Sequence, residues 1–171
     1  MSVVQKKVCM LGAYSVGKTS LVSQYVNSIF SEKYTTTIGV KIDKKQLELN
    51  EKTLSMVLWD VYGEDNHQRV MPSYLRGLSG YIIVVDPTRP STITGAISLQ
   101  NMVETSIGDM PFVLALNKCD LKDEWVDSLS ELEPLREKAV GVFETSAKLD
   151  TDVDALFETL GMAIIPESSS A

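Results

Sequence analysis

Short apolar runs alternate along this chain with segments whose apolar residues recur at helical spacing. The apolar or extended stretches lie at residues 8–11, 40–49, 54–61, 81–86, 112–117 and 140–144. Helical patterns follow or separate them at residues 18–25, 91–107, 129–139 and 152–165. Buried strands separated by helices are typical of a mostly parallel sheet that helices cover on both faces. The pattern therefore predicts an α/β fold with a six-stranded sheet.

The turn-like segment at residues 50–53 joins two of the extended stretches, so one edge strand is predicted to be antiparallel. The first of these two stretches carries four charged side chains between residues 41 and 45, which suits an exposed sheet edge because charge discourages pairing with another chain. No internal repeat interrupts the pattern. We expect one domain over residues 1–166 and a short serine-rich tail at residues 167–171.

Composition narrows the class of protein. The 171 residues include 16 Lys and Arg against 23 Asp and Glu, a net charge of −7, which argues against a nucleic-acid partner. Two cysteines are too few for a disulfide framework. We read no leader and no membrane span, Ser2 stands where N-myristoylation needs glycine, and the tail has no cysteine to prenylate. We therefore expect a cytoplasmic monomer without a membrane anchor in this chain.

The segment after the first predicted strand matches the phosphate-loop pattern G-x-x-x-x-G-K-[ST] and reads Gly12-Ala13-Tyr14-Ser15-Val16-Gly17-Lys18-Thr19. Its glycines let successive backbone N–H groups turn toward phosphate oxygens. Lys18 supplies a charge to the β- and γ-phosphates, and the Thr19 hydroxyl can bind Mg²⁺. An accidental glycine-rich turn is disfavoured, because the motif lies between a strand and a helix. The motif by itself distinguishes neither ATP from GTP nor a hydrolase from a kinase.

Two further motifs extend the nucleotide site. Asp60 and Gly63 form D-x-x-G at the end of a buried strand, where a carboxylate can hold Mg²⁺ or its bound water and a glycine N–H can reach the terminal phosphate. The second motif, Asn117-Lys118-Cys119-Asp120, follows another strand. Guanine presents N1–H and N2–H as a donor pair, which the Asp120 carboxylate can accept and which adenine lacks. Asn117 can brace loops, and Lys118 can lay its stem along the base.

A fourth segment, residues 144–148, also follows a strand and can offer a backbone N–H to the guanine O6. In this order the four motifs resemble those of the Ras superfamily of small GTPases over residues 5–165. The sequence Tyr34-Thr35-Thr36-Thr37-Ile38-Gly39-Val40, with Trp59 before Asp60, looks most like the Rab branch. The resemblance implies a small G-domain of the P-loop NTPase class, with GTP or GDP and Mg²⁺ as ligands.

Together the motifs and the resemblance give a set of expected site residues. The expected nucleotide-binding residues are Tyr14, Ser15, Val16, Gly17, Lys18, Thr19, Ser20, Phe30, Thr37, Gly63, Asn117, Lys118, Asp120, Ser146, Ala147 and Lys148. The expected metal ligands are Thr19, Thr37 and Asp60, and the expected catalytic residues are Glu64, Lys18 and Thr37. For Phe30, which the resemblance places against the guanine face, a plain hydrophobic contact is the alternative.

The resemblance also implies effector and regulator proteins as partners. They would bind through switch regions at about residues 32–42 and 61–76, on a surface that includes Ile42, Trp59 and Tyr74. Ile42 stands where the Rab branch usually has phenylalanine, so partner identity does not carry over. For Trp59, a tryptophan on a strand, a place in the core is the alternative to a place on this surface.

Two residues depart from the family pattern at positions that control the rate of GTP hydrolysis. Glu64 stands where the family usually has the glutamine that orients the attacking water, and a carboxylate can accept that water's proton but cannot donate a hydrogen bond. Tyr14 stands where Ras has glycine, and its ring would crowd the space that an arginine finger needs. The hypothesis is slow intrinsic GTP hydrolysis and a poor response to an arginine-finger activator. Alternatively, Tyr14 packs outside the loop and Glu64 is solvated.

Three classes of function are compatible with a phosphate loop in this chain. The first is a regulatory GTPase that cycles between two nucleotide states. The second is a non-cycling adaptor that retains GTP because Glu64 and Tyr14 block hydrolysis. The third, a P-loop phosphotransferase, needs arginines in a lid over the phosphates. It is disfavoured, because the chain has no lid-like insertion and its few arginines are Arg69, Arg76, Arg89 and Arg136.

Overall fold

The computed structural model describes residues 3–28, 30, 39–61, 70 and 72–165. In chain order the elements are β1 (Val3–Leu11), α1 (Lys18–Asn27), β2 (Val40–Leu49), β3 (Lys52–Val61), the 3₁₀ helix η1 (Pro72–Leu75), β4 (Leu78–Val85), α2 (Pro90–Ile107), β5 (Phe112–Leu116), the 3₁₀ helices η2 (Cys119–Glu124) and η3 (Asp127–Leu132), α3 (Glu133–Lys138), β6 (Gly141–Glu144) and α4 (Val153–Ile164).

Six strands within these residues form one sheet in the order β2-β3-β1-β4-β5-β6. β2 pairs antiparallel with β3, and the other neighbouring strands pair in parallel. The antiparallel pair arises from a tight turn at Asn50 and Glu51, whose φ angles of 49° and 63° are both positive, as a two-residue hairpin loop requires. The predicted α/β fold and its antiparallel edge strand are confirmed.

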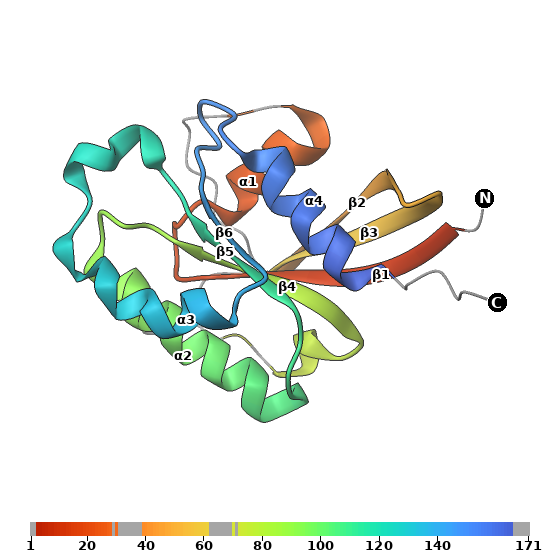
Figure 1. Ribbon diagram of the computed structural model, residues 1–171, viewed down its shortest axis with the longest axis horizontal. Helices are drawn as coiled ribbons and strands as arrows, with labels where there is room; N and C mark the ends of the chain where they lie inside the picture. The colour runs from red at the N-terminus through yellow and green to blue at the C-terminus, as the bar shows by residue number, and fades with distance from the viewer. Residues whose placement is uncertain (1–2, 29, 31–38, 62–69, 71, 166–171) are drawn as a thin grey trace.

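Helices cover both faces of the sheet: α1 and α4 lie on one face, and α2 and α3 lie on the other (Figure 1). Side chains alternate between the two faces along each central strand, as the two-residue period of a strand requires. In β1, Val8 and Met10 enter the core beneath α1 and α4, whereas Cys9 and Leu11 enter the core beneath α2 and α3. Because both faces of the sheet are buried there, the part of β1 beneath the helices, residues 8–11, is an uninterrupted apolar run.

Several predicted boundaries are corrected by the structure. The first strand begins at Val3 and not at residue 8, because β3 supplies a hydrogen-bonding partner even for the polar residues that precede the apolar run. The helix predicted over residues 129–139 is a 3₁₀ helix up to Leu132, and its α-helical part begins at Glu133 with Pro134 in the first turn, where a missing N–H costs least. None of the helices in the described ranges is long and apolar enough to cross a membrane.

Candidate functional site

Five segments meet at one edge of the sheet, because each lies at the carboxyl end of β1, β3, β4, β5 or β6, which run in parallel. They are residues 12–19 after β1, Asp60 at the end of β3, Asp86 after β4, Asn117 after β5 and Thr145 after β6. In open α/β sheets this edge is where ligands bind. The structure thus brings together motifs that lie more than 100 residues apart in the sequence.

The phosphate loop is held in a tight curve by close backbone packing. A side chain at Gly12 would place its Cβ 2.6 Å from the Val84 carbonyl oxygen, so the loop approaches β4 as only glycine permits. The Lys18 ammonium donates hydrogen bonds to the Gly12 and Ala13 carbonyls at 3.1 Å each, and its side chain is buried. α1 begins at Lys18, so the positive end of its helix dipole faces the curve. This arrangement suits an anion.

Asn117 joins the phosphate loop to the segment after β6. Its Nδ2 donates to the Val16 carbonyl at 3.0 Å, and its Oδ1 accepts from the Thr145 hydroxyl at 3.1 Å. Both Asn117 and Thr145 are buried, so neither hydrogen bond competes with bulk water. The predicted role of Asn117 as a brace is therefore seen directly, and Thr145 is a partner that the sequence reasoning did not single out.

Asp120 lies in an exposed position on η2, oriented by a neighbouring hydroxyl. Its Oδ1 accepts a hydrogen bond from the Ser146 hydroxyl at 2.9 Å, and the Ser146 oxygen in turn accepts from the Leu149 N–H at 3.0 Å. Ser146 is buried, so the hydroxyl that holds Asp120 is fixed in place. An exposed carboxylate held in one orientation can accept a pair of N–H donors from a ligand.

Asp60 and Thr19 form the part of the expected metal site that the structure describes. The Thr19 hydroxyl donates to Asp60 Oδ2 at 2.5 Å, whereas Asp60 Oδ1 is buried without a hydrogen-bond partner among the described residues. Burial raises the pKa of Asp60, and the hydrogen bond from Thr19 and the charge of Lys18 oppose that rise. A buried carboxylate oxygen without a partner beside a hydroxyl fits Mg²⁺, which prefers oxygen ligands and seldom needs more than one or two carboxylates.

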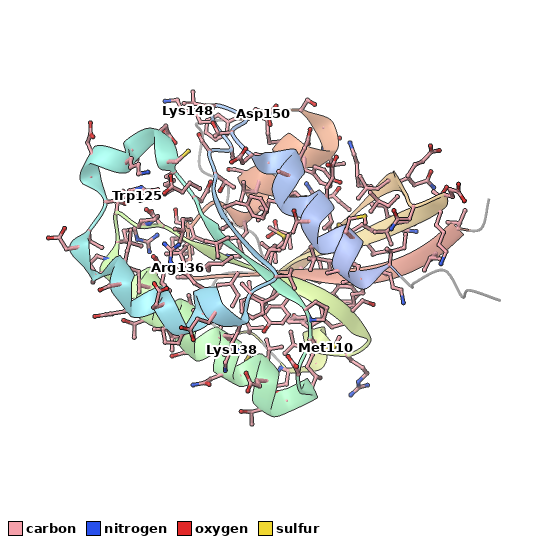
Figure 2. The ribbon with its side chains drawn as sticks, viewed as in Figure 1. Met110, Trp125, Arg136, Lys138, Lys148 and Asp150 are labelled. Atoms are coloured by element: carbon pink, nitrogen blue, oxygen red, sulfur yellow. The ribbon has the colours of Figure 1, made fainter. Side chains whose placement is uncertain are left out.

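The remaining predicted site residues divide into two groups. Thr37, Gly63 and Glu64 lie outside the described residues. Those that are described are Ser15, Val16 and Gly17 in the phosphate loop, Ser20 in the first turn of α1, Lys118 before η2, Ala147 buried after β6, and Lys148 exposed on the same loop. Figure 2 labels Lys148 there. Phe30 is half-buried against the core beneath α1 and α4, and Tyr14 is 39% exposed.

Comparison with known proteins decides the family. The sequence model of the Ras family matches residues 7–166. This chain belongs to the Ras family. It is similar to mouse Ras-related protein Rab-7b, at 35% identity over 161 residues that make up 92% of this chain and 81% of that protein. It is 32% identical to mouse Ras-related protein Rab-3C over 90% of this chain and 69% of that protein, and 33% identical to Rab7 of Drosophila melanogaster over 90% and 77%.

The similarity to Rab-named relatives confirms the Rab-like resemblance. Together with the Ras-family match, it identifies this protein as a small GTPase. Members of the family bind guanine nucleotides, generally with Mg²⁺, and interact with effectors and regulators. The described residues of the four expected motifs, which for D-x-x-G are Asp60 and Val61, lie at one edge of the sheet.

The residues expected at the partner surface of this Rab-like protein are brought onto one face of the sheet. Ile42 and Trp59 are register partners on the antiparallel strands β2 and β3, and Ile42 is 49% exposed. Trp59 and Tyr74 are both half-buried against the core beneath α2 and α3. The Lys7 ammonium lies 3.6 Å from the centroid of the Trp59 ring, a cation–π contact that fixes the ring on the sheet.

Two charged residues of this Ras-family site were given no role by the sequence reasoning. Asp86 follows β4 and is 1% exposed, and Arg89 lies at the start of α2 with its guanidinium 2.8 Å from the Tyr14 carbonyl oxygen. Arg89, one of the arginines that a phosphotransferase lid would need, instead contacts the phosphate loop. The available signal was the position of Asp86 at the end of an apolar strand, because a carboxylate there has to find a cation or donors when it is buried.

Proposed function

We propose that this protein is a Rab-like nucleotide switch that binds GTP and GDP, recruits effectors when GTP is bound, and hydrolyses GTP slowly. The observation that carries the proposal is the Asn117 side chain, which joins the phosphate loop to the loops beside Asp120. Through it, one rigid cluster presents a phosphate cradle and an oriented carboxylate at the same sheet edge. A guanine nucleotide has matching chemistry at its two ends, namely a polyphosphate and a pair of N–H donors.

In this proposal different residues bind the phosphates, the base and the metal ion. Lys18 and the backbone N–H groups of residues 15–19 bind the phosphates, Asp120 accepts the guanine N1–H and N2–H, and Lys118, Phe30 and Ala147 surround the base. Thr19, Asp60 and Thr37 are the proposed ligands of Mg²⁺, which when bound neutralises charge on the β- and γ-phosphates. The buried Oδ1 of Asp60, which has no hydrogen-bond partner within the described part of the chain, supports this assignment. The proposed catalytic residues are Glu64, Lys18 and Thr37.

The proposed slow hydrolysis follows from the chemistry of Glu64 and Tyr14. Attack of water on the γ-phosphorus needs a group that both accepts from and donates to its neighbours, and a carboxylate lacks the donor that an amide has. Negative charge on Glu64 is also repelled by the triphosphate. Tyr14 supports the same conclusion, because its side chain belongs to the phosphate loop and is 39% exposed, so its ring would crowd an activator's arginine.

Single-turnover GTP cleavage tests this proposal. We expect the wild type to cleave GTP more slowly than Rab-7b measured alongside it. Replacing Glu64 with glutamine is expected to raise the rate by about tenfold or more, since water positioning by a correctly protonated group contributes about 10²–10⁴-fold in enzymes.

The matched control is Glu104→Gln, an exposed acid on α2 remote from the phosphate loop, which should leave the rate unchanged. A wild-type rate equal to that of Rab-7b would contradict slow hydrolysis, and an unchanged rate in Glu64→Gln would shift the cause to Tyr14.

The second candidate function, favoured by the same two residues, is an adaptor that remains in the GTP state. It differs from the switch in the nucleotide that the protein carries after gentle purification. Chromatography of the released nucleotide should give mainly GDP for a cycling switch and abundant GTP for the adaptor. The recruitment of partners through the surface of Ile42, Trp59 and Tyr74 is proposed for both candidates.

A further inference from the structure

Asp86 is a buried carboxylate whose two oxygens both have partners. Its Oδ1 accepts hydrogen bonds from the Thr88 N–H at 3.0 Å and the Thr88 hydroxyl at 2.7 Å. Its Oδ2 lies 2.8 Å from the Lys118 ammonium and 3.9 Å from the Arg89 guanidinium. Burial acts to raise the pKa of Asp86, but hydrogen bonds from Lys118 and Thr88 outweigh it, so the pKa is lowered overall. Asp86 is therefore ionised at neutral pH and binds two cations.

Each of these two cations also contacts a carbonyl of the phosphate loop. Arg89 Nη1 donates to the Tyr14 carbonyl at 2.8 Å, and Lys118 Nζ donates to the Ser15 carbonyl at 3.2 Å. Asn117 donates to the next carbonyl, that of Val16. Three successive carbonyls of the loop are thus held by side chains that come from outside it.

Holding a carbonyl also fixes the direction of an N–H group. A trans peptide unit is planar, and its C=O and the N–H of the following residue point in opposite directions. When Arg89 and Lys118 hold the carbonyls of Tyr14 and Ser15, the N–H groups of Ser15 and Val16 point the opposite way within the same peptide planes, away from these two cations. Ser15 has a φ of 65°, a region that residues other than glycine seldom adopt, so this stretch of backbone needs outside contacts to keep its conformation.

We propose that Asp86 is a positioning residue for nucleotide phosphates, and that it acts by holding Arg89 and Lys118 on the carbonyls of Tyr14 and Ser15. The N–H groups of Ser15 and Val16 are thereby kept in the orientation that binds a diphosphate. Without the carboxylate, both long side chains would regain rotamer freedom and exchange their loop contacts for water. The inference rests on the proposed function, since it assigns a role within the same nucleotide site.

The test compares GDP with GMP, which lacks the β-phosphate. Asp86→Asn keeps the shape of the side chain and an acceptor for Thr88 but removes the charge that binds the two cations. Titration with a fluorescent GDP analogue should show dissociation constants raised by about 10- to 100-fold in Asp86→Asn and about tenfold in Arg89→Ala, the range for lost hydrogen bonds to charged groups. The dissociation constant of GMP, measured by competition, should change by less than about threefold in Arg89→Ala, because Arg89 contacts the phosphate loop and has no role at the base. In Asp86→Asn it should rise less than that of GDP, since the freed Lys118 also borders the base.

Arg89→Ala keeps the test decisive if Asp86→Asn folds poorly, because the Arg89 side chain is 38% exposed and lies at the surface. The double variant should lose little more GDP affinity than Asp86→Asn alone, because both residues act on the same loop contacts. The control Glu104→Gln neutralises an acid that pairs with Lys138, remote from the loop, and should leave both affinities unchanged.

Two results would overturn the inference. Equal losses of GDP and GMP affinity would show that Asp86 supports the fold or the base loops and not the phosphate loop, and an unchanged GDP affinity in both single variants would show that the loop needs neither residue. If the wild type itself failed to bind GDP, the proposed function would fall and this inference with it. If the wild type bound GDP and both Asp86→Asn and Arg89→Ala bound it equally well, only this inference would fall and the proposed function would stand.

Discussion

Replacing Asp120 with asparagine is expected to weaken GDP binding by at least about 100-fold, because one hydrogen bond to a charged group, worth about 1.5–3 kcal/mol, is lost and the other becomes a weaker bond to a neutral oxygen. The carboxylate is held by Ser146 and presents only acceptor atoms to a ligand. An asparagine amide brings an NH₂ group against the guanine N–H donors. Xanthine has a carbonyl in place of the guanine amino group, so the same substitution should improve the binding of XDP relative to GDP.

Competition of GDP and XDP against a fluorescent nucleotide measures this change of specificity. Asp123→Asn is the matched control, because Asp123 is exposed on the same 3₁₀ helix, and it should leave GDP affinity unchanged. If Asp120→Asn retained wild-type GDP affinity, the base would be recognised elsewhere. If GDP affinity fell without any gain for XDP relative to GDP, the substitution would have damaged the loop and not altered a hydrogen-bonding pattern.

Gly17→Ala is expected to destabilise the protein by about 2–5 kcal/mol and to abolish nucleotide binding, from the sum of backbone strain and lost buried hydrogen bonds. Gly17 has a φ of 106°, and a Cβ at this position would lie 2.2 Å from the Asn117 Nδ2 atom. Asn117 can move aside only by giving up its hydrogen bonds to Val16 and Thr145. The substitution thus disconnects the phosphate loop from two other motifs at once.

Urea unfolding of the nucleotide-free protein measures the stability change, and titration with a fluorescent GDP analogue measures binding. Gly95→Ala is the control, since Gly95 lies inside α2 and an added Cβ meets no atom within 4 Å. That control should stabilise the protein by about 0.5–1 kcal/mol, because alanine is the better helix former. Wild-type stability and binding in Gly17→Ala would show that the Asn117 contact is dispensable.

Much of this site was predictable because its chemistry is carried by short contiguous motifs. The residues from Gly12 to Thr19 could be recognised as a phosphate loop because the residue types that the motif needs are contiguous in the sequence, and Asp120 could be proposed for guanine from its acceptor atoms. The apolar runs of the central strands identified a buried parallel sheet for the same local reason. The roles of Glu64 and Thr37 stay predictions from the sequence, since both residues lie outside the described ranges.

What only the tertiary structure decided is which distant residues hold these motifs in place. Nothing near Asp86 in the sequence indicates that its carboxylate binds Lys118, 32 residues further on. That contact, the Arg89 contact with Tyr14 and the Asn117 contact with Val16 exist because parallel strands bring their carboxyl ends to one edge of the sheet. Sequence determined the chemical groups of the nucleotide site, and strand order determined their partners, because hydrogen bonds and ion pairs depend on distances that only the folded sheet sets.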